Sequence, residues 1–263
     1  MAAVSQTPQG GVLGRILAQK REDIARLRQR RFPAPGPRRA LDLHRMPGQA
    51  LRLITEIKRR SPSAGALSTH LGVGERAAAY ERGGASMISV LCDETFFDGR
   101  FEHLAEARAA SRLPLLCKDF VLDEVQLDAA RSYGADAVLL IVRCLDDAQL
   151  RALVAAARQR ELEPFVEIVD GTEAARALGA GATLIGVNAR DLDTLVMNAE
   201  RARTTLAALP DSVTRVHLSG LAKPADVAAV AQSPAHAALL GEALMRLDDP
   251  YPLLASLVAS ARP

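Results

Sequence analysis

Aromatic side chains are scarce in this chain of 263 residues. They make up 3% of the sequence and tryptophan is absent, whereas 49% of the residues are hydrophobic. That apolar fraction is enough for a sizeable buried core, so the core must be built mainly from Leu, Val, Ile and Ala. The length suits one large domain or two small ones, and α/β barrels routinely reach this size as a single domain.

Cysteine is also rare. The chain has three cysteines, Cys92, Cys117 and Cys144, which lie far apart in or beside apolar runs. An odd number of cysteines without a Cys-x-x-Cys pair argues against a disulfide framework and against a zinc site. We therefore expect buried thiols in a reducing compartment, and neither a metal ion nor another cofactor.

Neither charge nor hydrophobicity is concentrated in one part of the sequence. The formal net charge of +2 implies no strong field for nucleic acid. No apolar run approaches the ~20 residues of a membrane span, and the N-terminus lacks the apolar core of a signal peptide. We expect a cytoplasmic monomer that binds neither nucleic acid nor a membrane.

The N-terminal region differs in pattern from the rest of the sequence. Residues 1–11 are small and polar, and we predict that they are disordered. An amphipathic helix is predicted over Val12–Arg31, because apolar residues recur there at helical spacing among Lys and Arg. Three prolines and a glycine within residues 32–37 end this helical extension.

Apolar runs and helical stretches alternate in the remaining sequence. The apolar runs are continuous, as expected for parallel strands covered on both faces. They are Leu51–Lys58, Ser86–Leu91, Leu113–Lys118, Ala137–Val142, Phe165–Val169, Thr183–Asn188, Thr214–Ser219 and Ala237–Gly241. The helical stretches are Gly74–Arg82, Phe101–Ala110, Asp123–Ser132, Asp146–Arg160, Thr172–Leu178, Thr194–Ala208, Lys223–Ala231 and Glu242–Ala259.

Eight such units after the extension indicate a (β/α)8 TIM barrel, which we assign as one domain over residues 12–263. An open doubly wound sheet is the alternative. It is disfavoured because no G-x-G-x-x-G sequence opens a helix.

Polar side chains occur where the predicted strands end. They comprise two lysines, two glutamates, an asparagine, an arginine and a serine: Glu56, Lys58, Lys118, Glu167, Asn188, Arg190 and Ser219. In a (β/α)8 barrel the active site lies at the C-terminal ends of the strands. These residue types favour acid–base chemistry on an anionic substrate.

Several motifs occur in a fixed order along the chain. They include Glu-Ile-Lys-Arg-Arg-Ser-Pro-Ser at residues 56–63, Lys-Asp-Phe at 118–120, Gly-Val-Asn-Ala-Arg-Asp-Leu at 186–192 and Gly-Glu-Ala-Leu-Met at 241–245. From about Val12 to near the C-terminus, the chain resembles the indole-3-glycerol phosphate synthase family. The resemblance implies conversion of 1-(2-carboxyphenylamino)-1-deoxyribulose 5-phosphate to indole-3-glycerol phosphate, with loss of CO2 and water, in tryptophan biosynthesis.

The resemblance also implies catalytic roles. Lys118 matches the general acid for ring closure, and Glu167 matches the second acid–base group. Glu56 would position and polarise the reacting lysine, and Asn188 belongs to the same catalytic set. Lys58 would face the substrate anions or act as an acid in the dehydration, and the division of work between the two lysines stays open. Asp119 would hold Lys118 by charge or cap a turn.

Further positions match the family's binding residues. Substrate contacts are implied for Ser61, Phe97, Phe120, Leu139, Arg190 and Ser219, of which the two phenylalanines and the leucine would pack the anthranilate ring. Phosphate contacts are implied for Lys58, Ser219, Gly220, Gly241 and Glu242, where glycines let backbone N–H groups approach the anion.

Three positions depart from the family pattern. Ala64 stands where lysine is usual and Ala189 where asparagine or serine is usual, and both changes would adjust loops. Leu218 stands in place of a glutamate and removes an anionic group from the substrate's surroundings, for which His217 is a possible but poor replacement. Two alternatives follow: a related enzyme acting on another anthranilate or indole phosphate, and a barrel that binds a ligand or partner without turnover. The retained acid–base groups argue against the second.

Overall fold

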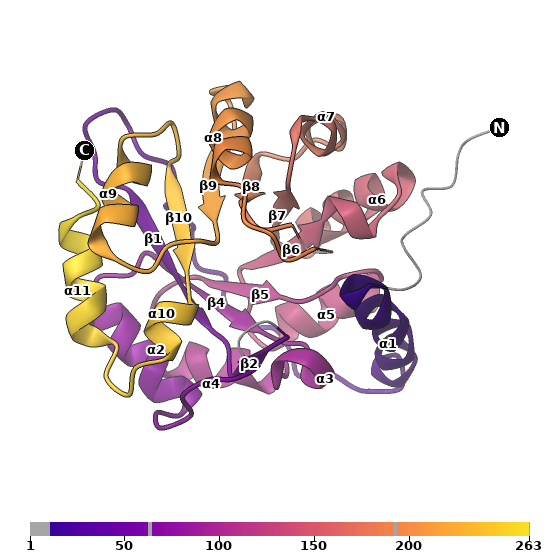
Figure 1. The fold of residues 1–263 in the computed structure, drawn as a ribbon. Coiled ribbons are helices and arrows are strands. Elements are labelled where there is room, and N and C mark those ends of the chain that lie inside the picture. The colour runs from indigo at the N-terminus through magenta and orange to yellow at the C-terminus, as the bar shows by residue number, and fades with distance from the viewer. Residues whose placement is uncertain (1–10, 63–64, 192–193, 263) are drawn as a thin grey trace.

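A computed structural model of the chain describes residues 11–62, 65–191 and 194–262. The disorder expected for residues 1–11 falls almost wholly outside this part, as does Ala64. Within it, eight parallel strands form a closed barrel in the spatial order β1-β10-β9-β8-β7-β6-β5-β4 (Figure 1). The strands are β1 (Arg52–Ile57), β4 (Met87–Leu91), β5 (Leu115–Lys118), β6 (Ala137–Ile141), β7 (Glu163–Ile168), β8 (Leu184–Asn188), β9 (Thr214–Leu218) and β10 (Ala237–Leu240).

The predicted (β/α)8 barrel is therefore confirmed, and each strand lies within two or three residues of the run that predicted it. The barrel closes where β1 pairs with β10, in the register Arg52↔Ala237 to Thr55↔Leu240. The first and last strands of the sheet are thus hydrogen-bonded neighbours, although they lie 180 residues or more apart in the sequence.

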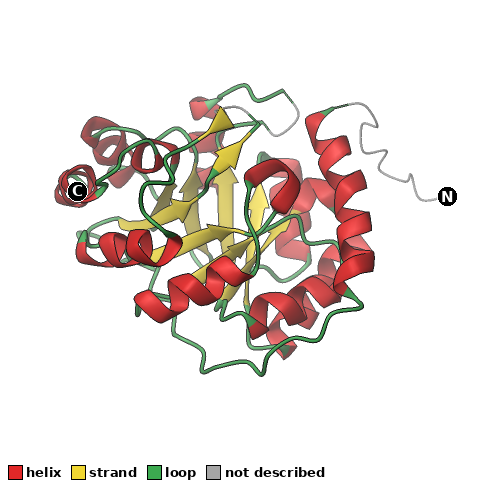
Figure 2. Cartoon of the chain, turned by 90° about the horizontal axis from the view of Figure 1, so that it is seen from below, coloured by secondary structure: helices red, strands yellow, loops and turns green. Residues whose placement is uncertain are grey.

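Helices surround the strands, as Figure 2 shows from below the view of Figure 1. They are α2 (Val73–Arg82), α4 (Glu102–Ala110), α5 (Glu124–Ser132), α6 (Asp147–Gln159), α7 (Gly171–Gly179), α8 (Ala199–Ala208), α9 (Pro224–Ala231) and α11 (Tyr251–Ala259). Four of them begin after an Asp or Asn whose side chain accepts a hydrogen bond from a backbone N–H of the first turn: Asp123, Asp146, Asp170 and Asn198. Such caps satisfy donors that a helix start leaves unpaired.

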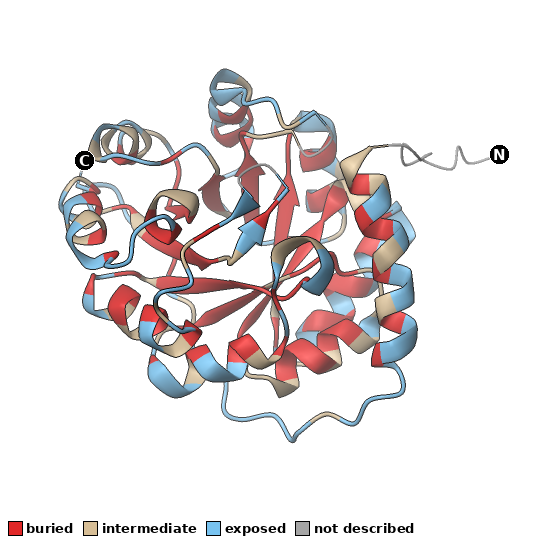
Figure 3. Cartoon of the chain, turned by 60° about the horizontal axis from the view of Figure 1, so that its bottom comes forward, coloured by how far each residue is buried: buried red, intermediate tan, exposed pale blue. Residues whose placement is uncertain are grey.

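The core consists of two layers (Figure 3). The larger layer fills the space between the sheet and the helices. The smaller layer fills the barrel interior, where side chains such as Ile54, Leu116 and Phe165 are almost fully buried. Residues from the extension helix α1 (Val12–Leu27), including Leu13 and Ile16, join this interior layer. The extension is therefore packed onto the barrel itself.

Three predicted helices have different limits. The stretch predicted as Glu242–Ala259 forms two helices, α10 (Glu242–Met245) and α11, because Pro250 interrupts it and restricts the residue before it. The helix predicted from Thr194 begins only at Ala199, after the Asn198 cap. The extension helix ends at Leu27 rather than at Arg31.

The sequence did not predict the short elements that follow several strands. They are the hairpin of β2 (Arg60–Ser61) and β3 (Gly65–Ala66), the helix α3 (Glu94–Phe97) and the 3-10 turn η1 (Val142–Cys144). Each lies just after the C-terminal end of a barrel strand. They build the rim of the barrel end at which the candidate site lies.

Candidate active site

A pocket of about 490 Å³ opens at the C-terminal ends of the barrel strands. Every site residue predicted from the sequence lines it: Glu56, Lys58, Ser61, Phe97, Lys118, Phe120, Leu139, Glu167, Asn188, Arg190, Ser219, Gly220, Gly241 and Glu242. The structure thus brings these residues together, although it does not test the role of any one of them.

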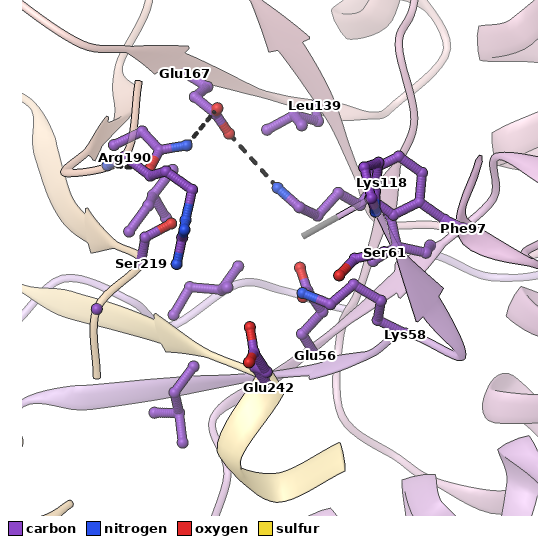
Figure 4. Close-up of a pocket in the computed structure, with 18 of the residues that line it drawn as sticks. Glu56, Lys58, Ser61, Phe97, Lys118, Leu139, Glu167, Arg190, Ser219 and Glu242 are labelled. Carbon is purple, nitrogen blue, oxygen red and sulfur yellow. Dashed lines mark hydrogen bonds and ion pairs between the residues drawn. The ribbon is translucent and has the colours of Figure 1, made fainter. Parts of the chain in front are cut away.

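One wall of the pocket carries a chain of polar contacts from β5 to β8 (Figure 4). Lys118 Nζ lies 3.5 Å from Glu167 Oε2, and Asn188 Nδ2 donates to Glu167 Oε1 at 2.9 Å. The Arg190 backbone N–H donates to Asn188 Oδ1 at 2.9 Å, which turns the amide nitrogen toward the glutamate. At 3.5 Å the lysine contact is an ion pair rather than a short hydrogen bond. Glu167 Oε2 is buried and has no hydrogen-bond partner among the described residues, so it keeps acceptor capacity.

A second ion pair lies on β1. Lys58 Nζ donates to Glu56 Oε1 at 2.6 Å, as the spacing of two residues on one strand face allows. The direct partner of Glu56 is thus Lys58, whereas Lys118 contacts Glu167. Burial opposes ionisation of the Glu56 carboxyl, but the ammonium groups of Lys58 and Lys118 outweigh it and lower the pKa of Glu56.

Lys118 is held in its charged form. Burial alone would lower the pKa of this ammonium group, but the carboxylates of Glu167 and Glu56 outweigh it and raise the pKa of Lys118. The side chain is about one-fifth exposed, so it is open to the pocket. A protonated lysine facing an enclosed space is suited to act as a general acid.

Apolar side chains line the part of the pocket beside Lys118 (Figure 4). Phe97 follows β4 on α3, Phe120 follows β5, and their rings lie 6.1 Å apart at an angle of 36°. Val12, Leu13 and Ile16 of α1 line the same pocket. The sequence analysis treated α1 as an extension and missed this contribution, although its apolar face was visible in the helical spacing.

The turns after β9 and β10 form a third part of the pocket. Ser219 and Gly220 both adopt the left-handed backbone conformation, with φ of 70° and 83°. A Cβ at Gly241 would lie 2.7 Å from both Cβ and Oε1 of Glu56, so glycine is needed there to leave room for the glutamate. Arg246 also lines the pocket and pairs with Glu242 at 2.8 Å. The sequence analysis missed this arginine.

Leu218 faces the barrel interior and lines the pocket. It packs so closely that a Cβ at Gly186 would lie 2.7 Å from Leu218 Cδ1. His217 is not among the residues that line the pocket, and its Nε2 is 3.0 Å from the Ser219 carbonyl oxygen. Burial lowers the pKa of His217. His217 therefore does not replace the glutamate carboxylate that is missing at position 218.

Two other positions singled out from the sequence serve different purposes. Asp119 does not pair with Lys118: its Oδ1 lies 2.7 Å from Lys20 Nζ of α1 and also accepts from the Phe120 backbone N–H. Ala189 is buried in the layer between sheet and helices, away from the pocket.

Neither a metal cluster nor a membrane span is found in the part of the chain that the structure describes. No three His, Cys, Asp or Glu side chains are grouped there in a way that could hold a metal ion. No helix there is long and apolar enough to cross a membrane. Cys92 and Cys117 are buried and Cys144 is half-buried, and Cys92 Sγ lies 3.6 Å from Cys117 Sγ.

The fold and the pocket define the class of protein. A (β/α)8 barrel whose C-terminal mouth combines charged lysines, buried carboxylates and an apolar wall is a barrel enzyme suited to an anionic and partly apolar small molecule. Solved structures agree on the fold. A 3-hexulose-6-phosphate synthase gives a TM-score of 0.64 at 19% identity, covering 80% of this chain and 99% of that one. A thiamine phosphate pyrophosphorylase from Pyrococcus furiosus gives 0.63 at 18% identity, covering 80% and 95%.

Sequence comparisons identify the family. The family model "Indole-3-glycerol phosphate synthase" matches residues 13–257. The chain is 40% identical over 261 residues to an indole-3-glycerol phosphate synthase of Kineococcus radiotolerans, covering 95% of each chain. It is 40% identical over 258 residues to that of Mycobacterium leprae strain TN, covering 95% of this chain and 94% of the relative. The chain belongs to the indole-3-glycerol phosphate synthase family.

Proposed function

We propose that this protein is an indole-3-glycerol phosphate synthase, a decarboxylating lyase of tryptophan biosynthesis. Its substrate would be 1-(2-carboxyphenylamino)-1-deoxyribulose 5-phosphate. The proposal is supported by family membership over nearly the whole chain. The observation that carries it is the placement of a charged lysine, Lys118, against a buried glutamate, Glu167, in a pocket that also has an apolar wall.

Ring closure requires a proton donor. As the aryl carbon that bears the carboxylate attacks the ketone carbon, the ketone oxygen gains negative charge and must be protonated. We assign this proton to the Lys118 ammonium group, which Glu167 and Glu56 keep charged. Loss of CO2 then restores the aromatic ring.

Dehydration requires an acid and a base. The hydroxyl formed in ring closure leaves as water with a proton from an acid, while a base removes the proton whose loss completes the indole. We assign the base to Glu167, which lines the pocket, and the acid to Lys58 or Lys118. Asn188 positions Glu167 through its 2.9 Å hydrogen bond.

Substrate binding divides between the remaining walls. The anthranilate ring would pack on Phe97, Phe120 and Leu139, and its carboxylate would be met by Arg190. The phosphate would lie at the turns after β9 and β10, near the backbone N–H groups of Gly220 and Gly241. Lys58 and Ser219 would contribute as well, and Ser61 would contact the substrate from the β2–β3 hairpin. Glu242 would contribute its backbone N–H, while its side chain holds Arg246.

We further propose that the protein acts as a cytoplasmic monomer on this sugar phosphate, without a cofactor, a nucleic acid or a membrane. The near-balanced net charge of +2 and the low number of cysteines support this setting.

The test is turnover by the purified protein. With the ribulose 5-phosphate substrate we expect indole absorbance and fluorescence to rise as one equivalent of CO2 is released per product. Absence of both signals, with ligand binding retained, would contradict the proposed reaction.

A second candidate rests on Leu218. Because this buried leucine stands where the family has a glutamate, a related aryl-amino sugar phosphate is the alternative substrate. Faster turnover of such a compound than of the family substrate would favour this alternative.

A further inference from the structure

Lys20, on the extension helix α1, is a buried charged residue that has no role in the proposed mechanism. Lys20 is only 3% exposed, and it does not line the pocket. Its Nζ lies 2.8 Å from Asp93 Oδ2 and 2.7 Å from Asp119 Oδ1. A third carboxylate, Asp23 on the same helix, lies farther away at 3.6 Å and is about one-fifth exposed. Asp93 and Asp119 are themselves buried. A buried ammonium group shared by two buried carboxylates is costly to assemble and strongly destabilised when one partner is removed.

The two aspartates are joined to the backbone at the ends of neighbouring strands. Asp93 follows β4, and its Oδ1 accepts from the Phe96 backbone N–H at 2.8 Å, which caps α3. Asp119 follows β5, and its Oδ1 accepts from the Phe120 backbone N–H at 2.9 Å. Asp119 Oδ2 accepts from Gln126 Nε2 at 3.1 Å. The Lys20 ammonium group therefore connects α1 to the turns after β4 and β5.

These turns carry three of the proposed site residues. Lys118 immediately precedes Asp119, Phe120 immediately follows it, and Phe97 is the last residue of the helix that Asp93 caps. The two phenylalanine rings face each other across 6.1 Å. Any separation of Asp93 from Asp119 would move the general acid relative to the aryl-binding wall.

The positive charge on Lys20 determines how Asp93 and Asp119 would respond to its removal. Burial opposes the charge on Lys20, but Asp119 and Asp93 outweigh it and raise the pKa of Lys20 above its ordinary value. An uncharged side chain at this position would leave two carboxylates facing each other out of water. They would then separate, or one would take up a proton.

We propose that Lys20 is a positioning residue, which holds the turns after β4 and β5 through Asp93 and Asp119 so that Lys118 and the Phe97–Phe120 wall are aligned for ring closure. This inference rests on the proposed function for its kinetic consequence. Its structural content concerns the placement of Lys118, which can be measured without turnover.

The first experiment compares Lys20→Met with Arg21→Met. Arg21 is the neighbouring exposed residue on the same helix and serves as the matched control. Lys20→Met should lower kcat by about 10- to 100-fold, with a smaller change in KM, because displacement of a reacting group by about 1 Å can cost that much. Arg21→Met should leave both constants within twofold of the wild type.

The second experiment uses rescue and pH. In Lys20→Met/Asp93→Asn the charge repulsion is removed, and the new amide nitrogen can donate to Asp119 while the amide oxygen still accepts from Phe96. The double variant should recover at least about fivefold in kcat over Lys20→Met. The kcat of Lys20→Met, relative to the wild type at the same pH, should also rise as the pH falls, because protonation of one carboxylate relieves the repulsion. A loss of packing alone would show neither effect.

The third experiment measures Lys118 directly. The sequence contains four lysines, at positions 20, 58, 118 and 223, so acetylation of Lys118 by acetic anhydride can be followed on its own peptide by mass spectrometry. Lys20→Met should shift the pH dependence of this acetylation, and the double variant should shift it back. If Lys20→Met does not fold, Lys20→Gln takes its place, since it keeps a neutral donor.

The outcomes are distinguishable. A wild type without turnover whose Lys118 reactivity nevertheless responds to Lys20→Met would overturn the proposed function and support the positioning role. A wild type with full turnover, in which Lys20→Met lowers Tm but leaves kcat and Lys118 acetylation unchanged, would overturn the positioning role.

Discussion

At the scale of single residues, Lys118 is the group on which the proposed chemistry depends most. Lys118→Met should lower kcat by about 10²-fold or more while leaving the affinity for a non-reacting substrate analogue largely intact, because the ammonium group acts mainly as the ketone oxygen gains charge. Steady-state kinetics and calorimetry measure the two effects. Lys223→Met, at an exposed lysine outside the pocket, is the control. Near wild-type kcat in Lys118→Met would show that another group is the acid.

Leu218 carries a second prediction. A missing charge-assisted hydrogen bond is worth roughly 1.5–3 kcal/mol, or about a ten- to hundredfold loss of kcat/KM. Leu218→Glu should therefore raise kcat/KM on the family substrate, and it should lower Tm because the carboxylate is placed beside Gly186 and Phe165 in the barrel interior.

Leu218→Gln, of similar shape but uncharged, separates the effect of charge from that of volume. If Leu218→Glu lowers activity and another aryl-amino sugar phosphate is the better substrate of the wild type, the alternative substrate class is correct.

Some pocket residues were predicted from the sequence and others were missed. The two groups reach the pocket in different ways. Glu56, Lys118 and Glu167 follow directly from strand ends, whose direction is fixed by the barrel. Arg246 and the apolar face of α1 reach the pocket only through tertiary packing. The pairing of Asp119 with Lys20 joins positions about a hundred residues apart, so no local pattern indicates it.

At the scale of elements, the turn after β9 is the proposed phosphate contact. Gly220 has a φ of 83°, and a Cβ there would lie 2.6 Å from Met197 Cε. Gly220→Val should therefore weaken a phosphate-bearing ligand by about tenfold, the loss expected for one charge-assisted hydrogen bond. A ligand without phosphate should be affected by less than twofold.

Calorimetry with both ligands measures the difference. Gly48→Val is the control, because Gly48 has a similar φ of 84° but open space around it and no place in the pocket. Equal losses for both ligands in Gly220→Val would count against a phosphate site at this turn.

The limits of helices and strands show where hydrophobic periodicity fails to predict secondary structure. The stretch from Glu242 to Ala259 keeps its apolar residues on both sides of Pro250, so the pattern continues while the helix does not. The strands β2 and β3 contain two residues each, and the helix α3 contains four. These elements are too short to establish a hydrophobic period. The elements hardest to predict are thus those that shape the rim of the pocket.

At the scale of the whole molecule, stability should depend on His236, which is remote from the pocket. Its Nδ1 accepts from the Arg215 backbone N–H at 2.9 Å, and its ring lies against that of His44, with centroids 4.1 Å apart and a tilt of 33°. Burial, together with His44 and nearby arginines, lowers the pKa of His236 to about 4. The folded state therefore favours the neutral ring, so this contribution is complete above pH 6.5 and is lost as the pH falls toward about 4.

His236→Asn should flatten this dependence, because an amide oxygen can accept the same hydrogen bond without titrating. The wild-type free energy of unfolding should fall more steeply between pH 6.5 and pH 4, by at most about 1.4 kcal/mol per pH unit for one proton and less after solvent screening. Urea unfolding at several pH values measures the two slopes. Parallel slopes would show that His236 does not contribute to acid sensitivity.

The architecture itself was accessible from the sequence, for a physical reason. Parallel strands covered on both faces must be continuously apolar, and runs such as Ala137–Val142 and Ala237–Gly241 satisfy this requirement. What periodicity does not show is closure, because the pairing of Arg52 with Ala237 joins opposite ends of the chain. The count of eight units and the family resemblance supplied that part of the prediction.

Barrel closure has a consequence for the newly made chain. Glu56 lies on the first strand, and the space that it occupies depends on Gly241, which follows the last one. During synthesis on a ribosome, Lys20, Asp93 and Asp119 are all available once residue 119 has emerged. The pocket, in contrast, stays incomplete until β10 is released more than a hundred residues later. Nascent chains arrested before Gly241 should therefore be able to form the Lys20 ion pairs early but remain unable to bind the substrate, so activity would appear only after β10 and Gly241 have been released.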